Sequence, residues 1–502
     1  MNHYFDISYE GNNVLRREKR ISLQETIHHA TLEILQDTGI KVMNENATEL
    51  FHSSGAIVEK FDGHSIVKIP PHMVEACLAW SPRKITYSGR VEDENYFARP
   101  GSVAFSTFGG CIKIIDPVTR KRRLSRKTDL ESIVRVCDYL DEIRVANRVL
   151  NATDVPSEAQ SVHNMEAILK NTGKHFIIGA DSPASLRAMA ALAAVSVDSR
   201  DNFVKEPIFS VSVCPVSPLV IPQNTASIII EAANAGIGIV VIPMAMSGGT
   251  AAATLAGALV SHNAEVLSCI VLAQLARKGA ACTYGSCSTI LDLRYGTSAV
   301  GSPEYAKINS AIAKLSKYYK LPSFVGGGCS DSKVPDHQSA YEFTLSAAMT
   351  AFSGANMIFG CGGLEQGLTM DYAKLIMDAE MVKMILNAAT DIPFDDDALA
   401  LDIINSVGPG GSFLTHEHTL RHMRDQSFTR LFDRRTLEDW GSETAKVSLL
   451  ELAYAEAADI INTHQPPKLP SGAEMAMEEI VKEFEIKAGI GKRMKTAVKA
   501  AA

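Results

Sequence analysis

The sequence lacks a long apolar run, a surplus of basic residues and a paired-cysteine pattern. Its 502 residues carry a formal net charge of −8, whereas nucleic-acid-binding proteins need a basic face. The basic run at 120–123 is interpreted as a solvated turn or a partner contact. The most apolar windows, such as 237–246, are too short to cross a bilayer, and the polar first 20 residues hold no signal-peptide core. We therefore expect a cytoplasmic protein with no nucleic-acid or membrane partner.

The cysteines give no metal or disulfide framework. There are nine of them, scattered along the chain, and the sequence has no C-x-x-C pair and no H-E-x-x-H helix. Dispersed thiols in odd number are typical of a reducing compartment. A cysteine–histidine nucleophile stays open as an alternative, as does the histidine pair within 416–418 as a ligand or substrate contact. Zinc at the strand ends is a further alternative, which would use Cys282, Cys287, Cys329 and Cys361.

Apolar, β-branched runs alternate with helical patterns through the middle of the chain, which is the α/β arrangement. Runs that are apolar almost throughout predict strands buried on both faces and hence parallel pairing. Eight such units favour a closed (β/α)8 TIM barrel over an open doubly wound sheet, whose nucleotide-binding G-x-G-x-x-G is absent after the first run. The runs are 103–115, 144–151, 175–180, 208–214, 238–246, 280–287, 322–329 and 356–361.

Helical patterns flank this middle part. Ser22 precedes a periodic apolar run and Gly39 follows it, which is the expected punctuation of a helix. Beyond the last run, an amphipathic helix is predicted at 442–462, followed by a proline-rich linker and a charged tail. We therefore predict a helical N-terminal cap at 1–95, a barrel at 96–395 and a helical C-terminal extension at 396–502.

Small residues cluster where the predicted strands end. Working sites of such barrels lie at the carboxyl ends of the strands, and these ends are rich in Gly, Ser and Cys, as at 106–110, 284–287 and 326–333. Small side chains let something large and flat approach the opening closely. Glycine-rich loops also bind phosphate, but no Walker pattern occurs and the loops carry few basic residues.

Aromatic rings and a polar loop are predicted near the same opening. Aromatic faces attract cations and form cages for quaternary ammonium groups, although each ring alone is more typical of a core. Asp336 fits a helix cap, and His337 would then lie on the first helical turn and face the opening. The rings nearest the predicted opening include Phe108, Tyr284, Tyr341 and Phe359.

Four segments together resemble the trimethylamine:corrinoid methyltransferase superfamily, which is MttB-like. They lie at 284–294, 301–305, 326–333 and 408–422, and the resemblance covers nearly the whole chain. It implies a TIM barrel whose opening docks a corrinoid protein. The partner's cobalamin would take a methyl group from a small amine, and the chain itself would hold no tightly bound cofactor and no metal.

The sequence differs from archetypal members of this superfamily at one position. Archetypal members carry pyrrolysine at the barrel opening, and in this chain Val334 stands there, within the loop 332–336. Members without pyrrolysine are expected to demethylate quaternary amines. Glycine betaine is favoured, and proline betaine, carnitine and choline are alternatives. A zinc-dependent methyltransferase, a binding protein without turnover and a lyase or aldolase also stay open.

The resemblance implies that the protein promotes the reaction by positioning its substrate. A quaternary ammonium leaves as a neutral amine, so no acid catalyst is required, and no catalytic residue is assigned. Substrate binding is predicted for Phe108, Tyr284, Tyr341 and Phe359 around the cation and for His337 and Gln338 at a carboxylate. The corrin is predicted to approach Gly109, Gly248, Ser286, Gly327, Asp331 and Gly362. A homo-oligomer is also expected.

Overall fold

The computed structural model describes residues 22–197, 199–443 and 447–490. At its centre lies an eight-stranded sheet in the order β6-β19-β18-β15-β13-β11-β10-β9, in which every pair is parallel. Each predicted run contains one of these strands. They are β6 (Ala104–Thr107), β9 (Ala146–Asn147), β10 (Phe176–Gly179), β11 (Phe209–Val213), β13 (Gly238–Val241), β15 (Cys282–Ser286), β18 (Ser323–Gly326) and β19 (Met357–Cys361).

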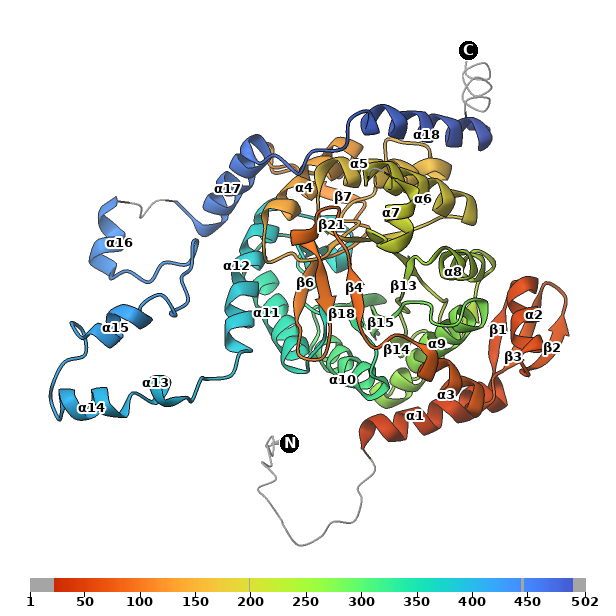
Figure 1. Cartoon of the computed structure of the whole chain (residues 1–502), viewed down its shortest axis with the longest axis horizontal. Helices are drawn as coiled ribbons and strands as arrows, with labels where there is room; N and C mark the ends of the chain where they lie inside the picture. Colours follow the sequence, from red (N-terminus) through yellow and green to blue (C-terminus); the bar gives the residue numbers. More distant parts are fainter. Residues whose placement is uncertain (1–21, 198, 444–446, 491–502) are drawn as a thin grey trace, which may run out of the picture.

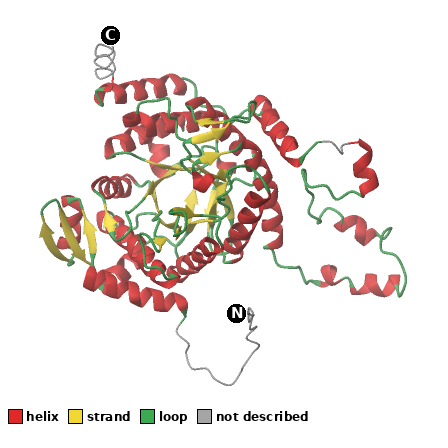
Figure 2. Cartoon of the chain, turned by 180° about the vertical axis from the view of Figure 1, so that it is seen from behind, coloured by secondary structure: helices red, strands yellow, loops and turns green. Residues whose placement is uncertain are grey.

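The sheet closes on itself. A parallel bridge joins Phe105 on β6 to Ile143 just before β9, and the main-chain N–H of Arg144 donates to the Phe105 carbonyl at 3.2 Å. Figure 2 shows the strands at the centre, within a ring of helices. The predicted (β/α)8 barrel is confirmed, and the open doubly wound sheet is excluded.

Helices follow the strands and cover the outside of the barrel (Figure 1). Side chains cap several of their starts: those of Ser182, Ser302 and Asp336 each accept a main-chain N–H of the first turn. The helices are α4 (Lys127–Tyr139), α5 (Gln160–Asn171), α6 (Pro183–Ser196), α8 (Gln223–Ala235), α9 (Leu255–Ala276), α10 (Pro303–Tyr319), α11 (His337–Phe352) and α12 (Tyr372–Ala388).

Helix α9 corrects one expectation. With 22 residues it is long and apolar enough to cross a membrane by length and composition, but 72% of its most apolar window is buried inside the fold. It is buried because it packs against both the barrel and the N-terminal helices α1 (Leu23–Glu33) and α3 (Pro71–Trp80). Buried polar groups tie it in place, as where Glu265 accepts the N–H of Leu219 at 3.0 Å. It is therefore a core helix.

A hairpin closes the amino end of the barrel. Its strands are β4 (Ile85–Tyr87) and β5 (Tyr96–Ala98). The Tyr87 hydroxyl lies 2.5 Å from the Thr283 hydroxyl on β15, and the Tyr96 hydroxyl donates at 2.7 Å to the main-chain carbonyl that precedes β19. Both rings pack with the apolar side chains of the barrel interior. The hairpin therefore covers the barrel interior at the amino end of the strands.

The described N-terminal residues are not purely helical, which corrects the predicted helical cap. A small sheet lies beside α8 and α9, where residues 220–221 add a short parallel strand. Alternating burial along β3 explains the strand, because one of its faces packs inward. Residues 1–21 lie outside the described residues, and the boundary at 95 stays a prediction. The sheet contains β1 (Ile40–Val42), β2 (Ile57–Phe61) and β3 (His64–Lys68), with α2 (Glu45–Ser53) packed on it.

After α12 the chain leaves the body of the protein as an arm, residues 391–443 (Figure 1). Helices α13, α14 and α15 of the arm have no buried residues. The chain returns through α17 (Leu449–Thr463), which packs on α12 and α4, and α18 (Ala473–Lys487), which packs on α6 and α5. Residues 444–446 of the predicted helix 442–462 lie outside the described residues. The arm helices are α13 (Asp396–Leu399), α14 (Leu401–Val407), α15 (Glu417–His422) and α16 (Leu437–Glu443).

Candidate functional site

Two small sheets stand at the carboxyl end of the barrel and form a rim around its opening, which we call the mouth. One extends from the ends of β6 and β19, and the other from the ends of β13 and β15. Because the interior is closed at the other end, the mouth is where a ligand can reach the barrel axis. The rim strands are β7 (Lys113–Ile115), β8 (Arg122–Leu124), β20 (Gly363–Leu364), β21 (Thr369–Met370), β14 (Met246–Ser247), β16 (Thr289–Asp292) and β17 (Thr297–Ala299).

Three phenylalanines form one wall of the mouth. Phe324 on β18 and Phe359 on β19 are stacked, with ring centroids 4.8 Å apart, and the ring of Phe108, just after β6, lies 6.1 Å from that of Phe359. Phe108 is partly exposed, whereas the other two are buried in the barrel interior. Aromatic faces attract cations, and of these three rings that of Phe108 is the one partly exposed at the mouth. Two of the predicted substrate-binding residues, Phe108 and Phe359, therefore lie together.

A guanidinium group lies beside this wall. Arg148 follows β9, the strand adjacent to β6, and is partly exposed. Its Nη2 lies 3.1 Å from the position that a side chain at Gly110 would take. Within the described ranges it forms no ion pair, and its buried Nε has no hydrogen-bond partner. Burial lowers the pKa of Arg148, while the negative charge of Asp181 raises it, and an arginine remains charged near neutral pH.

The structure does not place His337, Gln338 and Tyr341 in the mouth, which corrects their predicted roles. All three are exposed on the first turns of α11, Tyr341 by 72%. His337 lines a pocket between α11, α12 and the start of α17, and the Gln338 amide donates to Glu342 at 2.8 Å. Helix α11 packs beside α12, and its first turn borders the pocket between these two helices. The cap predicted for Asp336 is confirmed, since it accepts the N–H of Ser339 at 2.9 Å.

Tyr284 is also displaced from its predicted position. It is fully buried, and its hydroxyl donates to the Asn263 side chain on α9 at 2.6 Å. Successive side chains on a strand point to opposite faces. The neighbouring Thr283 faces the interior, where it meets Tyr87, so Tyr284 has to face the helices. It is a core residue between barrel and helix layer.

The predicted surface for corrin approach is only partly accessible. Gly109, Gly248 and Asp331 are partly exposed. Asp331 accepts the N–H of Val300 at 3.0 Å, and burial raises its pKa. Val334, which is predicted to stand at the pyrrolysine position, is 51% exposed, and its carbonyl accepts the hydroxyl of Ser332 at 2.9 Å.

The other three predicted approach residues are buried. Ser286 accepts the N–H of Ser288 at 3.0 Å. A side chain at Gly327 would meet the side chains of Ile358 on β19 and Thr350 on α11, and one at Gly362 would meet Met370. These residues are small because strands and helices approach each other closely there, so they do not face a docking partner.

The cysteines do not converge on a metal site. Cys282 and Cys361 pack in the layer between barrel and helices, whereas Cys287 and Cys329 face the barrel interior. The Tyr305 hydroxyl donates to the Cys329 sulfur at 3.3 Å, and burial raises the pKa of that thiol to about 12. Among the described residues, the one group of three candidate metal ligands lies on the arm, far along the chain from the strand ends: Asp397, His418 and His422.

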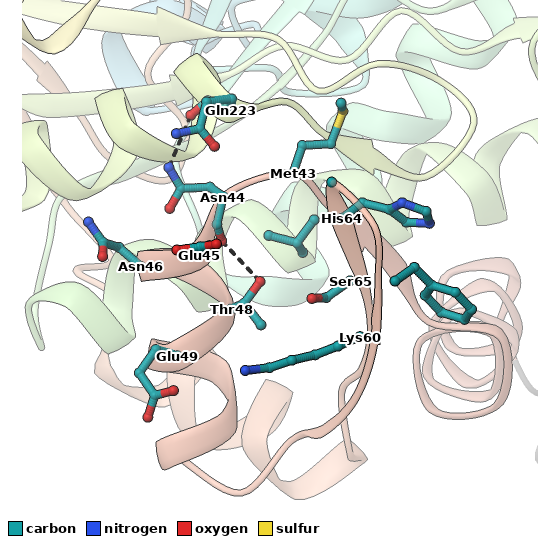
Figure 3. Close-up of a pocket in the computed structure, with 13 residues that line it drawn as sticks. Met43, Asn44, Glu45, Asn46, Thr48, Glu49, Lys60, His64, Ser65 and Gln223 are labelled. Atoms are coloured by element: carbon teal, nitrogen blue, oxygen red, sulfur yellow. Dashed lines mark hydrogen bonds between the residues drawn. The ribbon is translucent and has the colours of Figure 1, made fainter.

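A separate pocket of about 750 Å³ lies in the N-terminal sheet, outside the barrel. Figure 3 shows its polar lining, including Asn44, Lys60 and His64, with the Asn44 amide directed to Gln223. That amide also donates to Ser227 at 2.8 Å, so it attaches the N-terminal sheet to the start of α8. The contacts assign this region a structural role, and the mouth remains the site to consider for chemistry.

Comparison with known proteins decides the family. A profile described as trimethylamine methyltransferase (MTTB) matches residues 13–487. The chain belongs to this family. It is 41% identical to the trimethylamine methyltransferase MttB of Desulfitobacterium hafniense (strain DSM 10664 / DCB-2), over 93% of this chain and 94% of that one. It is 36% identical to MttB of Methanosarcina barkeri, over 91% and 93%.

A third relative bears a different name. The glycine betaine methyltransferase of D. hafniense (strain Y51) is 29% identical, over 91% of this chain and 95% of that one. Among solved structures, the monomethylamine methyltransferase MtmB of M. barkeri superposes with a TM-score of 0.52 at 14% identity, covering 89% of this chain and 88% of that one. At that identity the likeness concerns the fold alone. The protein is a methyltransferase with a TIM barrel.

Sequence reasoning missed two members of the mouth. Phe324 was not separated from other aromatic residues of the core. Arg148 lies in a predicted strand run, 144–151, that is otherwise mostly apolar. A charged residue near the carboxyl end of such a run is the signal that would have found it, because that end of the strand forms the mouth.

Proposed function

We propose that the protein moves a methyl group from a quaternary amine to the Co(I) of cobalamin carried by a separate corrinoid protein, with glycine betaine as the favoured substrate. The observation that carries the proposal is the wall of Phe108, Phe324 and Phe359, which reaches the mouth at Phe108. Aromatic faces suit a permanently charged ammonium group. The ordinary residue Val334 at the pyrrolysine position supports a quaternary substrate over trimethylamine.

The relatives support this choice in two ways. Family membership supports methyl transfer as the reaction class, and one relative is named for glycine betaine. Relatives of higher identity are named for trimethylamine. The substrate therefore has to be decided by the chemistry of the mouth, since identity alone favours the other amine.

The chain's own residues act by positioning in this proposal. The aromatic wall binds the ammonium group and turns one N–CH3 bond toward the opening, and the closed interior excludes water. The corrinoid supplies the nucleophilic cobalt when it is docked. The electron pair of the broken C–N bond stays on nitrogen, so a neutral tertiary amine leaves and no proton donor is needed. Gly109 and Gly110 leave space at the rim, because a side chain at either position would lie against Asn147 or Arg148.

A panel of amines tests the proposal. The protein is mixed with a corrinoid protein reduced to Co(I) and with glycine betaine, proline betaine, carnitine, choline or trimethylamine, and the absorption spectrum reports methylation of the corrinoid. We expect methylation with glycine betaine and none with trimethylamine. Methylation with trimethylamine alone would contradict the proposal. A partner shown to accept methyl groups from its own methyltransferase is the control for a competent corrinoid.

Two further features belong to the proposal. The nine cysteines are free thiols, which fits a cytoplasmic location.

The arm supports a homo-oligomer, because it exposes large apolar side chains, including Ile392, Phe394 and Leu414 at 87%, 82% and 83%. Light scattering should give a mass above 54.2 kDa, and the Phe394→Asp, Leu414→Asp variant should reduce it. A wild-type monomer at micromolar concentration would contradict an oligomer.

A further inference from the structure

We propose that Arg148 recognises the carboxylate of the substrate, so that the mouth selects quaternary ammonium carboxylates over choline and over uncharged amines. This inference rests on the proposed function and assigns it a specificity residue. The observation behind it is an unpaired guanidinium at the same opening as the aromatic wall of Phe108, Phe324 and Phe359.

The main chain holds Arg148 firmly between two neighbouring strands. Its N–H donates to the Ile177 carbonyl of β10 at 2.9 Å, and its carbonyl accepts the N–H of Gly110 at 2.6 Å. The Asn147 side chain accepts the same N–H at 2.9 Å. The backbone at position 148 is therefore fixed by the barrel, and the side chain starts from a defined point on the rim.

Two glycines give the guanidinium its space. A side-chain carbon at Gly110 would lie 3.1 Å from Nη2, and one at Gly179 would lie 3.8 Å from Nη1. Gly110 is two residues from Phe108, so their Cα atoms are within about 7 Å of each other. Gly110 therefore places the guanidinium and Phe108 on the same stretch of the rim.

No acid forms an ion pair with Arg148 in the described part of the chain. The carboxylate of Asp181 instead accepts the N–H of Ser161 at 3.3 Å. The thiols nearby do not supply negative charge, because burial raises the pKa of Cys111, to about 12, and of Cys214. An enclosed guanidinium with a buried, unpartnered Nε is costly for the fold. A carboxylate ligand would satisfy it with two parallel hydrogen bonds.

Three other cations on the rim strands are already paired. Lys113 and Arg122 each lie 3.4 Å from the carboxylate of Glu365. Arg123 contacts Asp116 and Asp129 at 3.0 and 2.6 Å. Arg148 therefore differs from these three cations, because its guanidinium is enclosed and forms no ion pair with the described residues.

The substrate chemistry follows from these two groups together. A betaine carries a trimethylammonium or related cation one or a few carbons from a carboxylate, which matches the wall and Arg148. Choline has the same cation but a hydroxyl in place of the carboxylate, so it would leave the guanidinium unsatisfied. Sites built around a buried polar group reject analogues that lack its partner by large factors.

The decisive variant is Arg148→Met, which keeps a long side chain and removes the charge. We expect kcat/KM for glycine betaine to fall about 100-fold, mainly through KM, because a charge-assisted bidentate contact is lost. Calorimetric binding of glycine betaine to the protein without its partner should weaken to the same extent. The affinity for choline should stay within about twofold, since choline has no carboxylate to lose. Arg148→Lys should recover part of the betaine affinity through its single point charge.

Arg122→Met is the matched control, since it removes a rim cation that is already paired. It should leave the ratio of betaine to choline affinity unchanged. The melting temperature of Arg148→Met should equal or exceed that of the wild type, because no ion pair is broken, and this separates a binding effect from misfolding.

The outcomes separate this inference from the proposed function. Methylation from glycine betaine by both wild type and Arg148→Met with the same KM would overturn the role of Arg148 and leave the function standing. Glycine betaine binding that depends on Arg148, without methyl transfer to a competent corrinoid partner, would support the role and overturn the function. Failure of the wild-type protein to bind any betaine would overturn both.

Discussion

The two ends of the barrel use the same eight strands in opposite ways. At the amino end, hydroxyl and imidazole groups are paired: Tyr87 with Thr283, Tyr96 with a main-chain carbonyl, and His175 with the Ser88 carbonyl and the Ser210 hydroxyl. At the carboxyl end, the Nε of Arg148 is buried without a partner.

The difference teaches where stability and binding capacity are located. A polar group that has its partner within the protein contributes to the fold, and one that lacks a partner is available to a ligand. The amino end is closed by a hairpin from the N-terminal region, whereas the carboxyl end is built by loops between strands and helices. Mutations at the two ends should therefore separate stability from activity.

The largest effect is expected at the closed end. Tyr87→Ala removes a fully buried ring and should lower the free energy of unfolding by about 3–5 kcal/mol. Tyr87→Phe is the matched variant and should lower it by about 1 kcal/mol, because only the hydrogen bond to Thr283 is lost. Urea titration measures both. A loss below about 1 kcal/mol for Tyr87→Ala would contradict the idea that this end carries the stability.

His175 predicts a pH dependence for the same end. Burial lowers its pKa from 6.5 to about 4. In the unfolded chain His175 binds a proton below about pH 6.5, whereas in the folded chain it does so only below about pH 4. Its contribution to stability is therefore present above pH 6.5 and is lost as the pH falls toward 4. The total is about 3 kcal/mol.

Urea midpoints measured from pH 7 to pH 4.5 check this prediction. His175→Gln should flatten the slope, because glutamine does not titrate. His262 provides an internal comparison, since burial also lowers its pKa to about 4, and its contribution should persist in the His175 variant. An identical slope in wild type and variant would show that His175 does not control it.

A smaller effect is expected at the mouth. Phe108→Leu keeps an apolar side chain but removes the aromatic face, and should lower kcat/KM for every quaternary amine about tenfold. Because Phe108 is partly exposed, the melting temperature should change by only a few degrees. This pattern differs from that of Arg148→Met, which should affect carboxylates alone. Unchanged kinetics with all amines would exclude Phe108 from the cation site.

The smallest effect is expected for His337→Ala. The side chain is exposed and faces the groove between α11 and α12, so steady-state kcat and KM for glycine betaine should stay within about twofold of the wild type. A tenfold loss would return His337 to the substrate site and would extend the functional region beyond the mouth.

The barrel could be predicted from the sequence because parallel strands buried on both faces leave visible apolar runs. The N-terminal sheet could not, since its strands of three to five residues leave patterns too short to separate from helix. The arm followed the predicted helical content only loosely, because helices without a buried face give no strong apolar periodicity.

The site was harder to predict than the fold, because it depends on the direction in which each side chain points. Phe108 and Phe359 lie together as the predicted cation site requires, and their role stays a prediction. The predicted position of Tyr284 was wrong, because a shift of one residue along a strand turns a side chain from the interior to the helix layer. Arg148 was missed because its significance lies in the absence of a partner, which becomes visible only when residues distant in the sequence are placed around it.

The hairpin of Tyr87 and Tyr96 also has a consequence for the order in which substrate and partner bind. Under the proposed function, with the amino end closed, the amine would enter, react and depart through the mouth, which the corrinoid protein would cover. Under the proposed function, the amine therefore binds before the partner docks, and the demethylated amine departs after the partner lifts away. Raising the concentration of corrinoid protein at limiting amine should slow turnover, as dead-end complexes accumulate over an empty barrel.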